Sequence, residues 1–427
     1  MWPSSPTGSA IPRSWIGWGS RAAAIFATYR AAFRAPGSAA FCAAAFLMRA
    51  PIAIYPIGLV LIVSARSGHY GFAGVLSGVY VLANGAGNPV LARLSDRWGQ
   101  RRLLVPASVV HAVATVALAV ALTRRWPDWT LVLPTAVAGF AYLSVSSLVR
   151  ARWSYVLAGR PELGTAYSVE STLDELIFVV GPLVATVVAT QLLPVLVLYL
   201  GIVLVGVGAL WLASLRGSEP PPHPAGSEGH RSALRERGMP LLTLVAAAMG
   251  VIFASAEISM VAFCGQHGQR SASGFVLAAF ALGSATSGLV YGARHWRSDL
   301  LDRFRGQAIV LAALQVLFLA AVNIGVMAAC AFVVGLGIAP TLITLYGLIE
   351  RIVPGAALTE GLAWLVTGLS IGYGAGAALV GGIADVHGAR AAFGVTVVAG
   401  ALLGALALAL HRQLGRHRAE SQPPAVT

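Results

Sequence analysis

The chain has 427 residues, of which 57% are hydrophobic and only 11% are charged. Soluble globular proteins carry about 25% charged residues, so this composition excludes a soluble domain and predicts that lipid is the main solvent. The net charge of +13 would favour nucleic acid only if the basic residues formed one patch. The three cysteines all lie in apolar runs, which indicates neither a disulfide framework nor a metal site.

Residues 1–37 lack the compact apolar core and small-residue cleavage site of a signal peptide. We expect them to form a cytoplasmic tail. Positions 20–34 form either a basic amphipathic helix against lipid headgroups or part of a disordered segment.

Twelve apolar runs are long enough to cross a bilayer, which takes about 20 residues. They cover residues 38–64, 71–91, 102–122, 129–149, 165–190, 192–215, 239–264, 273–293, 306–323, 325–349, 358–384 and 391–411. Residues 216–238 are rich in proline, glycine and charge, as in a flexible linker. The sequence therefore predicts an all-α membrane protein with helical bundles at 38–215 and 239–411, a cytoplasmic linker at 216–238 and a tail at 412–427.

The arginines give this arrangement an orientation. All 29 basic residues are arginine, and 23 of them lie in the two tails and the loops that share their side of the membrane. The positive-inside rule then puts both termini in the cytoplasm. The basic charge is a topology signal, so it no longer favours nucleic-acid binding.

The two predicted bundles share a pattern at the start of their fifth spans. Residues 161–170 and 354–360 each contain a proline and a glycine, then a small hydroxyl residue and a glutamate just inside the helix. A match at corresponding positions is typical of duplicated transporter folds.

The loop between the second and third spans reads Ala92-Arg-Leu-Ser-Asp-Arg-Trp-Gly-Gln-Arg-Arg102. It resembles the signature loop of the major facilitator superfamily, with two departures: Ala92 replaces a glycine, and Gln100 replaces the first basic residue. The resemblance implies a secondary transporter with two six-helix bundles and alternating access. We further expect a bacterial plasma (inner) membrane location and a monomer.

A tight turn at Gly99 would expose charges that can pair in one state and separate in another. The alternative is an ordinary positive-inside loop. The candidate gating residues are Asp96, Arg97, Gly99, Arg101 and Arg102.

The fifth span carries Glu170, Asp174 and Glu175, although charge at membrane depth is costly unless it is paired or hydrated. Arg49 and Asp174 are eleven and nine residues into helices that enter from the same side, so they lie within one turn of each other in depth. Asp174 is then either a structural partner of Arg49 or a proton site. We expect Glu170, nearest the interface, to be solvated.

Two further carboxylates lie in the second half. Glu257 stands alone beyond the midplane of the seventh span, where it either takes up and releases a proton or stays neutral and hydrogen-bonded. Glu360 is shallow and near a helix N-terminus, which favours a capping role over proton coupling.

Gly181-Pro182 in the fifth span removes a backbone hydrogen bond, so we expect a bend or break there. The pair partly resembles a Gly-Pro element of superfamily antiporters, which favours export.

Polar and aromatic residues in several spans are candidates to line a substrate cavity, or else are interface anchors. The candidates are Tyr55, Tyr80, Asn84, Tyr142, Tyr346 and Trp364.

Gly368-Leu-Ser370-Ile-Gly372 matches a hydrolase pattern, but that pattern requires a strand-turn-helix context. No phosphate-binding loop motif occurs, so we expect no enzyme, no cofactor and no metal. The sequence predicts proton-coupled export of a small amphipathic organic compound. Proton-linked uptake of a metabolite and a non-transporting scaffold or sensor are the alternatives.

Overall fold

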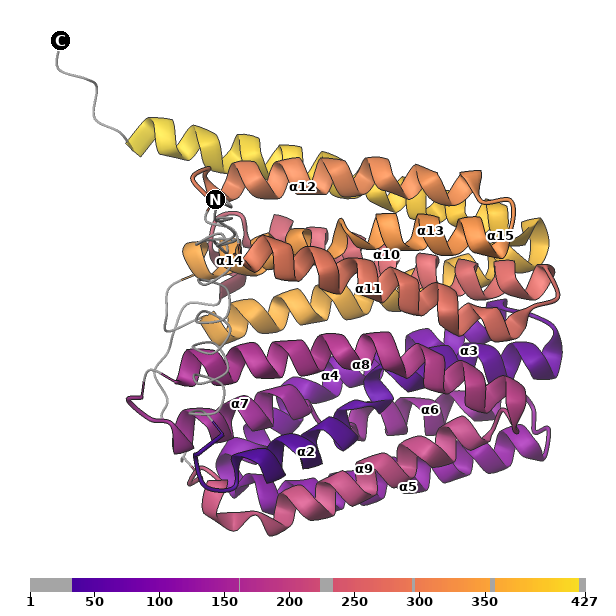
Figure 1. Ribbon diagram of the computed structural model, residues 1–427, viewed down its shortest axis with the longest axis horizontal. Helices are drawn as coiled ribbons and strands as arrows, with labels where there is room; N and C mark the ends of the chain where they lie inside the picture. Colours follow the sequence, from indigo (N-terminus) through magenta and orange to yellow (C-terminus); the bar gives the residue numbers. More distant parts are fainter. Residues whose placement is uncertain (1–32, 161, 223–232, 294–295, 354–357, 422–427) are drawn as a thin grey trace, which may run out of the picture.

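The computed structural model describes residues 33–160, 162–222, 233–293, 296–353 and 358–421. Every regular element in this part of the chain is a helix. Figure 1 shows the helices running roughly side by side, with the first half of the chain and the second half forming separate groups.

The first half contains eight helices and a short 3-10 turn. They are α2 (Ser38–Arg49), α3 (Pro51–Ser67), α4 (Gly71–Trp98), α5 (Gln100–Thr123), α6 (Trp129–Ala141), α7 (Val145–Val156), α8 (Leu163–Gln191), α9 (Leu196–Ser214) and η1 (Arg216–Ser218).

The second half begins after the linker residues. Its elements are η2 (Ala233–Arg235), α10 (Met239–Gln266), η3 (Arg270–Ala272), α11 (Ser273–Ala293), α12 (Leu300–Leu314), η4 (Gln315–Ala320), α13 (Ile324–Gly335), α14 (Ile338–Ile352) and α15 (Leu358–Ser421).

The described residues contain 11 segments long and apolar enough to cross a membrane. The last of these, Gly361–Leu414, has 54 residues, far more than the roughly 20 that one crossing needs. Its helix breaks at Gly388, where φ is 82° and ψ is 171°, a backbone conformation essentially restricted to glycine. The segment is therefore two spans, and the predicted all-α fold of twelve membrane helices is confirmed.

Several spans predicted as single helices consist of two pieces. The first span is α2 followed by α3, with Pro51 at the junction, and the fourth is α6 followed by α7. Breaks leave backbone groups without helical partners, and in lipid these need other partners. The Tyr142 hydroxyl donates to the Met48 carbonyl at 2.7 Å, and Asn84 Nδ2 donates to the Tyr142 carbonyl at 2.8 Å.

The structure contradicts a helix break at Gly181-Pro182, while the alternative, a bend, stays a prediction. Helix α8 continues through both residues from Leu163 to Gln191. A Cβ atom added at Gly181 would lie 2.7 Å from Ala53 Cβ. This glycine therefore permits close packing of α8 against α3, and packing from both sides keeps the helix continuous despite the missing proline hydrogen bond.

The two halves meet along α4 and α15. A Cβ at Gly78 would lie 2.8 Å from the Gly374 carbonyl oxygen, and one at Gly85 would lie 2.5 Å from Ser370 Oγ. A second contact joins α8 to α11, where a Cβ at Gly274 would lie 2.8 Å from Thr186 Oγ1. Small residues let the helices approach this closely. Figure 1 shows α8 and α11 adjacent where the two groups of helices meet.

Candidate functional site

Glu170 in α8 is the centre of a buried polar cluster. Its carboxylate pairs with Arg49, and the exposed fractions of the two side chains are 0% and 3%. Glu170 Oε1 also accepts hydrogen bonds from Trp153 Nε1 at 2.9 Å and Cys42 Sγ at 3.2 Å. These three donors satisfy a carboxylate that has no access to solvent.

The expectation that Glu170 is solvated is therefore wrong. Side chains in a helix tilt toward its N-terminus, so the long Arg49 side chain extends back from the end of α2. That direction brings its guanidinium level with Glu170, one helical turn before Asp174. Only the depths of the backbone positions follow from the sequence, and these depths therefore predicted Asp174 as the partner of Arg49.

Asp174 does contact Arg49, as expected, but it has a second cation as well. Its Oδ1 lies 3.2 Å from Arg49 Nε and accepts a hydrogen bond from Ser146 Oγ at 3.0 Å. Its Oδ2 lies 3.5 Å from Arg150 Nη2, and the Asp174 side chain is 27% exposed. Asp174 thus joins the buried pair to a more accessible arginine that the sequence pattern did not single out.

Three predicted site residues have side chains that lie outside the described part of the structure. They are Glu175, Glu360 and Asp96. Their roles stay predictions.

Glu257 in α10 occupies a second polar position, at the contact between the halves. Its Oε1 is buried and has no hydrogen-bond partner. Tyr373 from α15 interacts with the carboxyl group, and the Tyr373 hydroxyl lies 3.3 Å from Ser77 Oγ in α4. A chain of polar groups therefore leads from Glu257 across to the first half.

Asp385 makes a contact that the sequence analysis missed. At the end of the molecule remote from the termini, its two carboxylate oxygens accept hydrogen bonds from the Tyr70 N–H at 2.5 Å and the Gly71 N–H at 2.6 Å. These N–H groups begin α4, where the helix dipole favours a negative charge. Asp385 thus ties the second half to the first at this end.

The predicted gating loop forms a tight turn, with Gly99 at φ 89°. The side chains of Arg97, Arg101 and Arg102 are exposed. The Arg101 backbone N–H donates to Glu219 Oε1 at 2.9 Å, so the first linker residues are attached to this loop.

Gln100, which departs from the family pattern, is buried beside a buried arginine from α7. Arg152 Nε donates to Gln100 Oε1 at 2.7 Å, and Arg152 Nη1 donates to Ser218 Oγ at 2.9 Å. A basic residue at position 100 would face the Arg152 guanidinium, which explains physically why a neutral acceptor suits this position.

Three of the six candidate cavity residues are buried in the interior of the first half. Tyr55, Tyr80 and Tyr142 are each no more than 3% exposed. Tyr55 packs on Tyr80 and on His111, at centroid distances of 5.4 and 5.5 Å. The Tyr55 and Tyr80 rings pack between helices, and the Tyr142 hydroxyl bonds at the break between α2 and α3. Tyr346, in contrast, is 38% exposed.

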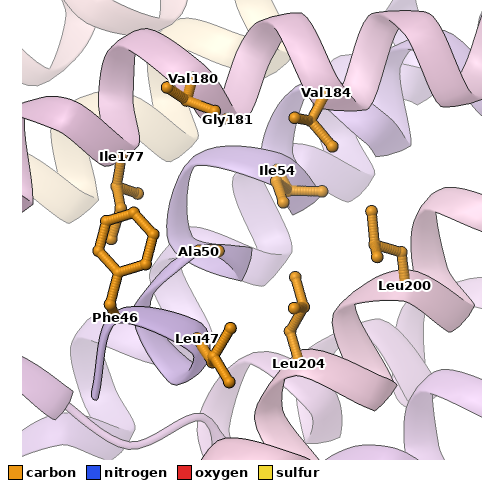
Figure 2. Close-up of a pocket in the computed structure, with 10 residues that line it drawn as sticks. All are labelled: Phe46, Leu47, Ala50, Ile54, Ile177, Val180, Gly181, Val184, Leu200 and Leu204. Atoms are coloured by element: carbon orange, nitrogen blue, oxygen red, sulfur yellow. The ribbon is translucent and has the colours of Figure 1, made fainter. Parts of the chain in front are cut away.

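One pocket of about 240 Å³ lies between the first, fifth and sixth spans. Figure 2 shows that its lining side chains are hydrocarbon. The lining residues are Phe46, Leu47, Ala50, Ile54, Ile177, Val180, Gly181, Val184, Leu200 and Leu204. All of them are apolar residues of the first half, and none is a member of the charged cluster. In the part of the chain that the structure describes, no group of side chains is arranged to hold a metal ion.

The sequence matches the family model described as Major Facilitator Superfamily over residues 38–306 and 266–426. The chain belongs to this superfamily. No curated protein matches the sequence. The family membership makes the chain a multi-pass membrane transporter of small molecules and not an enzyme.

Solved structures share the superfamily fold at low sequence identity. The nucleoside transporter NupG is 14% identical with a TM-score of 0.67, covering 89% of this chain and 99% of that chain. The human organic anion transporter MFSD10 is 14% identical with a TM-score of 0.61, covering 88% and 99%. A bacterial homologue of the human lysosomal transporter Spinster is 13% identical with a TM-score of 0.68, covering 91% and 99%. At these identities the likeness concerns the fold alone.

Proposed function

We propose that this superfamily transporter exports a small amphipathic organic compound in exchange for protons, by alternating access. The proposal includes six-helix bundles at residues 38–215 and 239–411, with both termini in the cytoplasm. It also includes a monomer in a bacterial plasma membrane. The arginine distribution supports the orientation, and the Gly181-Pro182 resemblance favours export over uptake.

The observation that carries the proton coupling is the Glu257 carboxyl group. This group lies within a membrane span, and one of its oxygens is buried without a hydrogen-bond partner. Tyr373 interacts with the carboxyl group, and the Tyr373 hydroxyl also lies beside Ser77 of the other half. An intramembrane acid in that position supports a site that binds a proton in one state and releases it in another. Asp174, which is 27% exposed, is the second candidate for the proton.

The test uses purified protein in liposomes that contain a pH-sensitive dye. Compounds are chosen by metabolite and toxin-sensitivity profiling of a deletion strain. We expect an active compound to move protons, and the sign of the pH change separates export from uptake. Glu257→Gln should reduce this proton movement at least about tenfold, the effect of one lost acid–base group.

Glu350→Gln is the matched control, because Glu350 is an exposed acid in α14. It should leave proton movement unchanged. Proton movement that survives Glu257→Gln would assign the proton to another acid. Accumulation of a compound with no pH change would contradict proton coupling, and a chain that moves no profiled compound would favour the scaffold alternative.

A further inference from the structure

Arg150 lies in the last two turns of the fourth span, and most of its donor groups are unused. Its side chain is 43% exposed, and its ion-pair partner is Asp174 Oδ2 at 3.5 Å. A guanidinium carries five N–H donors in a planar fork. One contact at the limit of hydrogen-bonding distance leaves most of this fork open.

Arg150 lies near the end of its span. It lies six residues before the end of the fourth span, Trp129–Val156, which is about 9 Å at 1.5 Å per residue. A guanidinium at this depth is tolerated when it faces a polar pathway and not lipid. Arg150 also interacts electrostatically with Tyr346 of the second half, so we take its exposed side chain to face the second half.

Tyr346 occupies the corresponding position in the second half. It lies six residues before the end of the tenth span, Ile324–Ile352, and is 38% exposed. It interacts electrostatically with both Arg150 and Asp174. The two halves thus bring a cation and a phenol near each other, each six residues before the end of its span.

The balance of charge distinguishes Arg150 from Arg49. Arg49 is buried and contacts both Glu170 and Asp174. Asp174 Oδ1 is used by Arg49 and by Ser146 at 3.0 Å, so only Oδ2 faces Arg150. Arg150 is the cation in this cluster with the weakest counter-charge and the greatest exposure.

We propose that Arg150 and Tyr346 bind the carboxylate of the transported compound, which makes the substrate class a small organic anion. This inference rests on the proposed transport function. The guanidinium fork matches a carboxylate in two-point geometry, and the Tyr346 hydroxyl supplies a further donor from the opposite half. Asp174 is the internal anion that the substrate carboxylate displaces from Arg150.

A substrate held in this way contacts both halves at once. The bound substrate therefore stabilises states in which α7 and α14 are close, relative to states in which these helices are apart. The same contacts therefore account for recognition and for the coupling of binding to the movement of the halves.

The test measures whether the site attracts an anionic or a cationic reagent, and it does not require the substrate to be known. Cys42, Cys264 and Cys330 are replaced by alanine, and Tyr346→Cys supplies a single thiol. Its reaction rates with a sulfonate-bearing and a trimethylammonium-bearing methanethiosulfonate are compared in the purified full-length protein. Ser147→Cys, at an exposed position one turn from Arg150, is the second reporter if the first variant does not fold.

We expect Arg150→Gln to lower the anionic-to-cationic rate ratio at least about fivefold, and Asp174→Asn to raise it by a similar factor, as unit charges near the thiol should. Arg412→Gln, an exposed arginine near the C-terminus, should leave the ratio unchanged. A ratio insensitive to Arg150, or one that falls on Asp174→Asn, would overturn the anion site. Proton-linked transport of only neutral or cationic compounds would also overturn it, while the proposed function would stand.

Discussion

At the scale of single residues, the two carboxylates on one face of α8 have different roles. The Glu170 carboxylate is fully buried and is bonded by three donor side chains. Asp174 is 27% exposed and lies between two arginines. This difference bears on whether Asp174 is a structural partner of Arg49 or a proton site, a choice that the sequence left open. Glu170 is the buried counter-charge of Arg49, whereas Asp174 stays the candidate residue for a change of partner during transport.

Substitution of each carboxylate tests this division. Removing one member of a buried ion pair costs about 3–5 kcal/mol, because the other charge stays buried without compensation. Glu170→Gln should therefore lower the melting temperature of the detergent-purified protein strongly. Asp174→Asn should lower it much less, since Arg49 keeps Glu170. The opposite order of melting temperatures would mean that Asp174 is the structural partner.

At the scale of elements, glycines decide how closely the halves approach. Gly78 in α4 faces the backbone of α15, and a Cβ there would lie 2.8 Å from the Gly374 carbonyl oxygen. Backbone atoms cannot move aside as a flexible side chain can, so this contact depends on the missing side chain.

Two alanine substitutions separate packing from helix propensity. Alanine is favoured over glycine in a helix interior by about 1 kcal/mol. Gly206→Ala in α9, where a Cβ would meet nothing within 4 Å, should keep or raise the melting temperature. Gly78→Ala should lower it, since overpacking costs about 1–3 kcal/mol. Equal thermal stability of the two variants would contradict the close contact between α4 and α15.

At the scale of the whole molecule, the contacts between halves concentrate away from the termini. Asp385 binds the start of α4 at the remote end, and the glycine contacts continue to Gly85. The exposed Arg150 and Tyr346 lie nearer the termini. We infer that these contacts hold the two halves together at the remote end, which is the non-cytoplasmic side if the positive-inside prediction holds.

Loss of the Asp385 charge should shift this conformation. Hydrogen bonds to a charged group contribute about 1.5–3 kcal/mol, so Asp385→Asn should raise the population open at the remote end about tenfold or more. A single cysteine at the buried Ser77 position then reacts faster with a water-soluble thiol reagent. Asp128→Asn, which removes an exposed acid bonded within the first half, should not change the rate. An unchanged rate in Asp385→Asn would mean that this contact does not hold the halves together.

The sequence by itself determined the features that depend on a single segment. Apolar length predicted the twelve spans, and the cost of charge in lipid pointed to Arg49, Asp174 and Glu257. The orientation inferred from the arginine counts stays a prediction. These inferences need only the thickness of a bilayer and the rise of a helix.

Only the tertiary structure decided which side chains meet. The pairing of Arg49 with Glu170, the accessible Arg150 and the Asp385 contact depend on how helices are rotated and packed against one another. The span breaks near Pro51 and Tyr142, and the unbroken helix at Pro182, depend likewise on partners from other helices. Such contacts join residues far apart in the chain, and neither helical period nor apolar length specifies the rotation of one helix relative to its neighbours.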